Sequence, residues 1–277
     1  MRINLISDVH LEFGDLVLPG GDVLILSGDI CEAKHIKLSE YQPDFVKLPL
    51  EDPTKRADRY ARFFVEECAK YRRVVYVMGN HEHYHFAYDD TYDYLKSQLP
   101  ANVTLLENET VVIDGIVFIG TTLWTDCNNK NPITVYDVKQ CMNDYRVIKK
   151  KPSANHNFYG KLTPEFTIHT HEISREYIRQ QLKLHKDRKC VVVTHHAPSE
   201  TSISSEFKHD FHMNGAYFSS LEDLILDNPN CMLWTHGHVH NYNNYKLGNT
   251  TVLSNPRGYL NYERRANEFT PDVGIDL

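Results

Sequence analysis

The chain has 277 residues, of which 41% are hydrophobic and 24% are charged, and its formal net charge is −7. This composition is that of a globular protein with a buried core, and it excludes a chain that is disordered throughout. The excess of acidic residues argues against an extended basic surface that binds nucleic acid, because the phosphate backbone is bound mainly by Lys and Arg.

The cellular setting is indicated by what the sequence lacks. No apolar stretch approaches the length of a membrane span, and the chain opens on a strand-like run without the pattern of a signal peptide. The six cysteines are scattered and form no C-x-x-C pair. We therefore expect a cytoplasmic protein with reduced thiols and no membrane partner. The 16 histidines are unusual, and their positions are informative because histidine is the commonest metal ligand.

Five apolar runs predict strands buried on both faces, because nearly every position is apolar and many are β-branched. They cover residues 3–7, 23–27, 74–78, 191–194 and 231–235. Further strand-like runs lie at 103–106, 110–113, 116–120, 244–246 and 250–253. Apolar residues at helical spacing predict helices over 54–70, 164–184 and 217–226. The sequence thus predicts an α/β (α+β) protein with two sheets flanked by helices, in one domain over 1–277. Irregular insertions are expected near 31–53 and 127–163.

Each of the five runs is followed within three residues by a polar residue that can bind a metal. The series reads Asp8-Val9-His10, Gly28-Asp29, Gly79-Asn80-His81-Glu82, His195-His196 and Gly237-His238-Val239-His240. Any one of these endings also fits an ordinary turn. Together they predict a site assembled from distant parts of the chain, because ligand sites in α/β sheets form beyond the carboxyl ends of the strands.

This ordered set of motifs resembles the calcineurin-like metallophosphoesterase superfamily, and the resemblance runs from Asp8 to His240. It implies a four-layer αββα sandwich of two mixed sheets flanked by helices. It also implies a site for two divalent metal ions. One ion would be held by Asp8, His10, Asp29 and His240, and the other by Asp29, Asn80, His195 and His238, with Asp29 as the bridge. The nitrogen and oxygen ligands, without a thiolate, favour Mn, Fe or Zn.

The same resemblance implies an enzyme that hydrolyses a phosphoester by attack of a metal-bridging hydroxide, with Asp29 central to the chemistry. His81 would contact the phosphate and protonate the leaving group. Of the adjacent His195 and His196, the resemblance favours His195 as the ligand and leaves His196 as a candidate substrate contact. Arg257 is a second candidate, as a clamp on a phosphate oxygen, although an ordinary turn arginine explains it equally well.

The substrate and two competing functions remain open at this level. The superfamily includes protein phosphatases, nucleases, phosphodiesterases and nucleotide hydrolases; the acidic charge and the short segment after His240 favour a small phosphodiester or nucleotide. Residues 81–85 also fit the H-E-x-x-H pattern of zinc peptidases, but that chemistry needs a helix, and these residues follow a strand and a Gly-Asn turn. A non-catalytic scaffold of this fold is disfavoured because every expected ligand is present.

Overall fold

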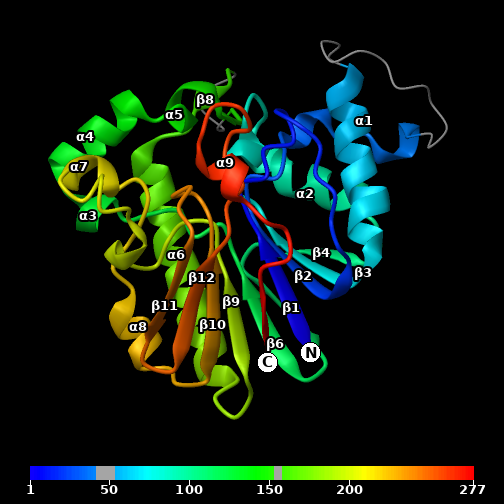
Figure 1. Cartoon of the computed structure of the whole chain (residues 1–277). Helices are drawn as coiled ribbons and strands as arrows, with labels where there is room; N and C mark the ends of the chain where they lie inside the picture. Colours follow the sequence, from blue (N-terminus) through cyan, green and yellow to red (C-terminus); the bar gives the residue numbers. More distant parts are fainter. Residues whose placement is uncertain (42–53, 153–157) are drawn as a thin grey trace.

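Two mixed β-sheets packed face to face form the centre of the computed structural model, which describes residues 1–41, 54–152 and 158–277 (Figure 1). The first sheet has the order β13-β1-β2-β3-β4, and its first four strands in the chain are parallel. Its strands are β1 (Arg2–Ile6), β2 (Gly21–Ser27), β3 (Tyr71–Val77), β4 (Val103–Leu105) and the antiparallel edge strand β13 (Gly274–Asp276).

The second sheet has the order β11-β12-β10-β9-β6-β5, with four parallel strands in the middle and an antiparallel strand at each edge. Its strands are β5 (Glu109–Ile113), β6 (Ile116–Gly120), β9 (Cys190–Val193), β10 (Cys231–His236), β11 (Asn243–Leu247) and β12 (Thr250–Ser254). A separate two-stranded ribbon joins β7 (Lys149–Lys150) and β8 (Gly160–Lys161). All ten predicted strands are confirmed; their ends agree within one or two residues, except that β3 begins at Tyr71, three residues before the predicted start.

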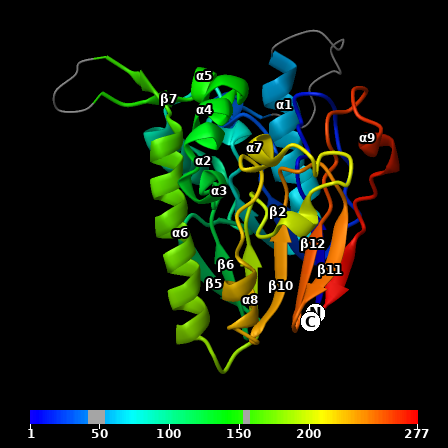
Figure 2. The same ribbon diagram turned by 90° about the vertical axis from the view of Figure 1, so that its left-hand side faces the viewer.

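Alternation along the strands explains why helices cover both outer faces. In β2, Val23 and Ile25 face the second sheet, whereas Leu24 and Leu26 face α1 (Thr54–Arg62) and the turns that continue it to Lys70. On the far side, the second sheet packs against α6 (Pro164–Leu184) and α8 (Glu222–Leu226). Figure 2 shows α6 running the length of that face. The four-layer sandwich is therefore confirmed, and no helix within the described ranges could cross a membrane.

The structure differs from the sequence prediction in three segments. The helix expected over 217–226 begins only at Glu222, because the backbone of 217–219 pairs with Ala197 instead. A helix that was not predicted, α2 (Tyr88–Gln98), covers the first sheet together with α1. Much of the expected insertion at 127–163 is regular, with α3 (Cys127–Lys130), α4 (Pro132–Cys141) and α5 (Asp144–Val147) before the β7–β8 ribbon.

The remaining short elements lie in loops. They are turns of 3-10 helix at Ala33–His35, Leu38–Glu40, His81–His83 and Glu200–Ser202, and the helices α7 (Phe211–Asn214) and α9 (Arg265–Glu268). Most of these loops gather at the end of the sandwich opposite the two chain termini (Figure 1). Residues 42–53 of the first expected insertion, and 153–157 of the second, lie outside the described residues.

Candidate metal centre

Seven predicted metal ligands meet at the carboxyl ends of the central strands. Asp8 and His10 follow β1, Asp29 follows β2, and Asn80 follows β3 in the first sheet; His195 follows β9, and His238 and His240 follow β10 in the second. Because all these strands are parallel within their sheets, their carboxyl ends lie on one edge of the sandwich. The site therefore spans the seam between the two sheets.

The backbone at these strand ends is strained. Five of the seven residues have a left-handed backbone, with φ of 48° at Asp8, 45° at His10, 54° at Asp29, 66° at His238 and 44° at His240. Each such residue costs roughly 1–3 kcal/mol when it is not glycine. Strain of this kind concentrates at functional sites, where it directs side chains to positions that regular strands cannot reach.

Glycine occurs in the strand-end motifs because the ligand side chains occupy the space of a Cβ. A Cβ on Gly79 would lie 2.1 Å from Asp29 Oδ1, and one on Gly237 would lie 2.6 Å from Asp8 Oδ2. Both distances are well below van der Waals contact, so any other residue at either position would displace a carboxylate. The two glycines thus set how closely the strand ends approach each other.

The first group of facing donor atoms comes from Asp8, His10 and His240. His10 Nδ1 lies 3.0 Å from Glu12 Oε1, and His240 Nδ1 lies 2.9 Å from Glu263 Oε1. Since these carboxylates accept the Nδ1 protons, each neutral ring carries its lone pair on Nε2. The two Nε2 atoms face each other at 3.2 Å, and His240 Nε2 lies 3.4 Å from Asp8 Oδ1. Lone pairs this close repel unless a proton or a cation lies among them.

The second group comes from Asp29, Asn80, His195 and His238. His195 Nδ1 donates to Ser27 O at 2.8 Å, which leaves the lone pair of a neutral ring on Nε2. That Nε2 lies 3.0 Å from Asn80 Oδ1 and 3.4 Å from Asp29 Oδ2. His238 Nε2 is buried without a hydrogen-bond partner in the described part of the chain. A buried, unpaired nitrogen is costly, and a cation beside Asp29 would satisfy it.

Asp29 is shared between neighbouring groups. Its carboxylate clusters with His195 and His238 on one side and with His10 and His81 on the other. Oδ1 accepts the backbone N–H of His81 at 2.8 Å, whereas Oδ2 lies 3.4 Å from His195 Nε2 and 3.9 Å from His10 Nε2. The converging lone pairs, the unpaired His238 nitrogen and the shared carboxylate fit a pair of divalent cations.

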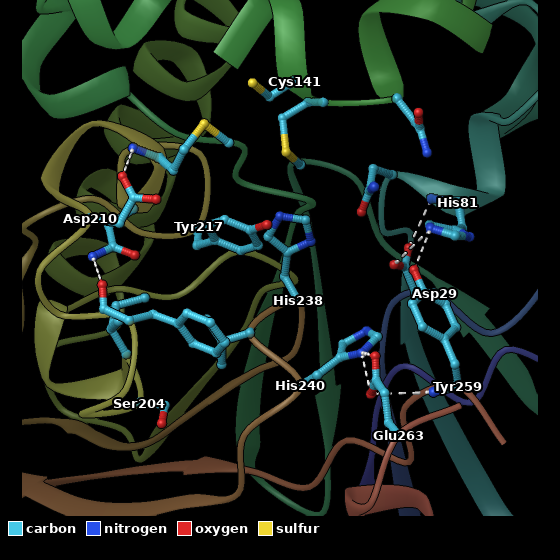
Figure 3. Close-up of a pocket in the computed structure, with 18 of the residues that line it drawn as sticks. Asp29, His81, Cys141, Ser204, Asp210, Tyr217, His238, His240, Tyr259 and Glu263 are labelled. Atoms are coloured by element: carbon cyan, nitrogen blue, oxygen red, sulfur yellow. Dashed lines mark hydrogen bonds and ion pairs between the residues drawn. The ribbon is translucent and has the colours of Figure 1, made fainter. Parts of the chain in front are cut away.

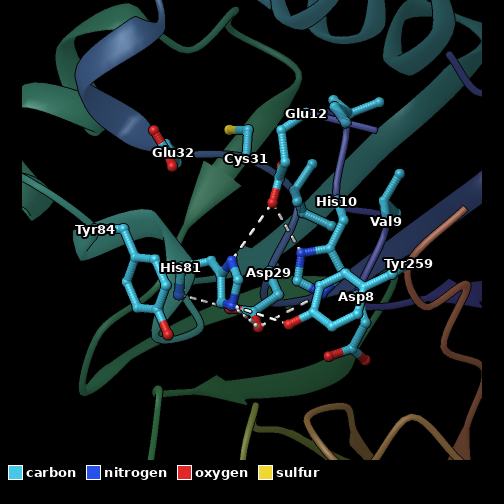
Figure 4. A network of polar contacts seen from close by, with 12 residues as sticks. Asp8, Val9, His10, Glu12, Asp29, Cys31, Glu32, His81, Tyr84 and Tyr259 are labelled. Atoms are coloured by element: carbon cyan, nitrogen blue, oxygen red, sulfur yellow. Dashed lines mark hydrogen bonds and ion pairs between the residues drawn. The ribbon is translucent and has the colours of Figure 1, made fainter. Parts of the chain in front are cut away.

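His81 borders the site and is held by two side chains (Figure 4). Glu12 Oε1 lies 3.4 Å from His81 Nδ1 and 3.0 Å from His10 Nδ1, so one carboxylate orients both rings. The ring of Tyr84 stacks on His81 with centroids 4.1 Å apart. Burial alone would lower the pKa of His81, but the carboxylates of Asp29 and Glu12 outweigh it and raise the pKa to about 9.

Asp144, from α5, holds the Asn80 amide in one orientation. Its buried Oδ1 accepts Asn80 Nδ2 at 2.8 Å and the Tyr84 hydroxyl at 2.9 Å. Since a carboxylate only accepts, it selects the amide rotamer in which Asn80 Oδ1 faces His195 Nε2. Tyr84 also stacks on His81. Asp144 therefore connects the segment 127–163 to Asn80 directly and to His81 through Tyr84.

Sequence reasoning did not find the residues that orient His81 and the proposed ligands: Glu12, Tyr84, Asp144 and Glu263. Glu12 had a local signal, since it lies two residues beyond His10. Asp144 and Glu263 had none, because each is a single acidic residue far along the chain from the side chain that it contacts. The helix that precedes α5, α4, could have been predicted from the sequence, because Asn131 and Pro132 form a standard N-terminal cap.

The two candidate substrate contacts lie away from the pocket. His196 is buried behind His238, with ring centroids 4.3 Å apart, and its Nδ1 lies 3.3 Å from Thr122 O. The Arg257 guanidinium is also buried, and it donates to the carbonyl oxygens of Gly14 at 3.0 Å and Asp15 at 2.8 Å. Both residues therefore contact backbone carbonyl oxygens around the site, and we do not propose either as a phosphate contact. The same arrangement puts His195, the neighbour of His196, among the donor atoms.

The zinc-peptidase pattern at 81–85 does not form the helix that its chemistry requires. His81–His83 is a single 3-10 turn, and His85 has a left-handed backbone with φ of 59°. The two outer histidines therefore do not share a helix face. Glu82 is fully buried and bonded to backbone amides, so its carboxylate does not face the pocket as a general base would.

A cavity of about 570 Å³ opens from the metal centre (Figure 3). Asp29, Asn80, His81, His238 and His240 lie at its inner end. The outer walls come from the ends of α4 and α5, from the segment 203–217 and from Tyr259. A space of this size accommodates a small organic phosphate.

Three comparisons with known proteins agree with this arrangement. A family model described as calcineurin-like phosphoesterase matches residues 1–242. The uncharacterized protein L509 of Acanthamoeba polyphaga mimivirus is 30% identical to this chain over 302 residues, which cover 100% of the chain and 97% of the viral protein. The solved structure of the phosphopantetheinyl hydrolase PptH from Mycobacterium tuberculosis is similar with a TM-score of 0.66 and 16% identity, over 98% of this chain and 93% of that one. At this identity, the structural match shows a shared fold.

The contact between Asp144 and Asn80 can be tested by metal binding. Asp144→Leu removes the acceptor and frees the amide to turn, so we expect the second ion to bind about 10- to 100-fold more weakly. Asp144→Asn retains an acceptor oxygen at this position and should stay within a few-fold of wild type. Titration calorimetry with Mn²⁺ or Zn²⁺ measures both. Tyr84→Phe is the matched control, since it removes the other donor to Asp144. Two ions bound at wild-type affinity in a folded Asp144→Leu variant would contradict the assignment.

Metal uptake should also release protons. Burial tends to lower the pKa of His195 and His240, but the neighbouring carboxylates outweigh it and raise these pKa values to about 9 and about 10. Both rings are therefore protonated at pH 7 in the metal-free protein. Because a metal binds the neutral ring, we expect roughly two protons to leave per protein, and the apparent affinity to rise as the pH increases towards 9. Calorimetry in buffers of different ionisation enthalpy counts these protons; a binding enthalpy independent of buffer would refute the expectation.

Proposed function

The chain belongs to the calcineurin-like phosphoesterase family, and from that premise we propose that it hydrolyses a small phosphodiester or nucleotide with the aid of two divalent metal ions. The observation that carries the proposal is the position of Asp29 at the inner end of the cavity, where its carboxylate clusters with His195 and His238 on one side and with His10 on the other. Asp8, His10, Asp29 and His240 would hold one ion, and Asp29, Asn80, His195 and His238 the other. We infer Mn, Fe or Zn from the nitrogen and oxygen donors.

Two bound divalent ions supply charge that stabilises the phosphoryl group in the transition state and lower the pKa of water at the site. The residues of this chain then bind and orient the reactants. Asp29 and the histidines around it fix the inner end of the cavity, where the phosphoryl group would lie. Tyr84 and Glu12 hold the His81 ring beside it.

His81 is suited to protonate the leaving group. With its pKa raised to about 9 in the metal-free protein, the ring carries a proton at neutral pH, although bound cations act in the opposite direction. Glu12 holds the Nδ1 side, and Nε2, which lies 3.4 Å from the Tyr259 hydroxyl and 4.0 Å from Asp29 Oδ2, would act as the donor. In the overall reaction the oxygen of water forms a new bond to phosphorus, and the bond from phosphorus to the leaving oxygen breaks. That oxygen takes the proton from His81, which recovers one from the attacking water.

The cavity favours a small substrate over a polymer. In the part of the chain that the structure describes, no Lys or Arg lines it. A nucleic acid strand would bring several phosphates close to these walls, and a groove that binds such a strand is usually positively charged. One phosphoryl group at the metal centre needs no such groove.

The first test concerns the shared carboxylate. Asp29→Asn should reduce turnover of bis(p-nitrophenyl) phosphate at least about 10³-fold and lower the content of both metals, because the variant weakens two sets of ligands at once. Asp8→Asn is the matched comparison, and it should affect chiefly one ion. Metal analysis and initial rates after addition of Mn²⁺, Zn²⁺ or Fe²⁺ give the answer. Two fully occupied ions in an active Asp29→Asn variant would disprove the two-metal assignment.

The second test concerns His81. His81→Asn should keep both metals, since its ring is not among the proposed ligands. It should lose about 10²–10⁴-fold in kcat/KM on alkyl or nucleoside esters and less on p-nitrophenyl esters, whose phenolate leaves without a proton. The measurement is the ratio of kcat/KM for the two leaving groups. A ratio equal to that of wild type would limit His81 to binding the phosphate.

A further inference from the structure

The cavity extends beyond the metal centre to a carboxylate at its far end. Figure 3 shows Asp29 and His81 at one side of the view and Asp210 at the other, with Tyr217 between them. The wall between these ends is formed largely by apolar and aromatic side chains: Met142, Ile203, Phe207, Met213 and Tyr217. A substrate with its phosphate at the metal centre would extend its organic part along this wall.

Asp210 carries a negative charge that no described cation balances. One carboxylate oxygen, Oδ1, accepts the backbone N–H of Met213 at the start of α7, at 3.3 Å. In the described part of the chain Asp210 forms no ion pair, and the cavity is lined by neither Lys nor Arg. Asp210 is exposed and lines the cavity, so a group that enters the cavity meets its charge. A second anionic group on the substrate would be repelled here.

Aromatic rings line the cavity together with this carboxylate. Phe207 is 55% exposed and its carbonyl oxygen accepts the backbone N–H of Asp210, so the two residues belong to one turn. Tyr217 packs against the proposed ligand His238, with ring centroids 4.9 Å apart. Aromatic faces attract cations, most strongly where the cation loses water. A carboxylate and aromatic rings in one cavity are a common means of recognising an ammonium group.

We propose that the substrate is a phosphoester whose organic part carries an ammonium group, bound between Asp210 and the rings of Phe207 and Tyr217. This inference rests on the proposed phosphoesterase function and names the class of substrate for the same site. A neutral hydrogen-bond donor would satisfy one carboxylate oxygen but would leave the charge unbalanced. An ammonium balances the charge and also contacts the aromatic faces.

Two phosphodiesters that differ in a single atom provide the test. p-Nitrophenyl phosphocholine carries a quaternary ammonium, and p-nitrophenyl 3,3-dimethylbutyl phosphate has carbon in place of that nitrogen. The leaving group is the same in both. We expect the wild-type protein, with its metals bound, to prefer the ammonium ester by about tenfold or more in kcat/KM, mostly through KM. The preference should shrink as salt is added.

Asp210→Asn is the informative variant, because Asn is also a good N-cap and retains the contact with the amide of Met213. It should bring the ratio of kcat/KM close to one by weakening the ammonium ester alone. Asp187→Asn is the matched control. It makes the same change in net charge at an exposed turn between α6 and β9, away from the carboxyl ends of the strands, and should keep the wild-type ratio.

The outcomes separate this inference from the proposed function. Turnover of both esters with a ratio within about twofold of one, or a preference that persists in Asp210→Asn, would overturn the ammonium site and leave the phosphoesterase function intact. If neither ester is turned over with any metal, the proposed function fails for this substrate class. Titration of the metal-loaded protein with phosphocholine and 3,3-dimethylbutyl phosphate then decides the inference: equal binding refutes it, and tighter phosphocholine binding that Asp210→Asn abolishes supports it.

Discussion

The arrangement of the metal centre depends on one buried carboxylate, that of Glu82. It accepts the backbone N–H groups of Gly79 at 2.6 Å, Ile30 at 2.7 Å and Asp29 at 3.1 Å, and the Tyr76 hydroxyl at 2.7 Å. Glu82 thereby ties the loop after β2 to the turn after β3. Without it, these amides would be buried without partners, which is costly for each group. The position of Asp29, and with it the shared carboxylate of the site, follows from this contact.

The ionisation of Glu82, and with it these backbone contacts, depends on the charge at the metal centre. Burial raises the pKa of Glu82 to about 7, and the negative charge on Asp29 contributes to the rise. Cations held by Asp29 would act in the opposite direction and favour the ionised carboxylate that the amides require. The metal ions would therefore stabilise the loops that position their own ligands, because they bind the folded arrangement and not the unfolded chain.

The sequence predicted the parts of the site that are determined locally. A buried strand, a glycine and a metal-binding side chain follow one another within a few residues, so Gly79-Asn80 and Gly237-His238 could be recognised without knowing the fold. The contacts that orient the ligands could not be, because they join distant residues: Asp144 is 64 positions from Asn80. An isolated acidic residue in a polar segment has the same appearance whether it is solvated or buried. The left-handed backbone at Asp8 and His240 was equally hidden, since neither residue type requires it.

The location of the ligands explains why the strained left-handed backbone at the strand ends persists. The first sheet supplies Asp8, His10, Asp29 and Asn80, and the second supplies His195, His238 and His240. The donor atoms of both sets converge on the seam, where their lone pairs repel unless positive charge lies between them. In the metal-free protein that charge is a proton: against the effect of burial, the carboxylates of Asp29, Asp8 and Glu263 hold the pKa values of His195 and His240 well above that of an ordinary histidine. A divalent ion held by ligands from both sheets would replace these protons, and its free energy of binding would offset the backbone strain at the strand ends.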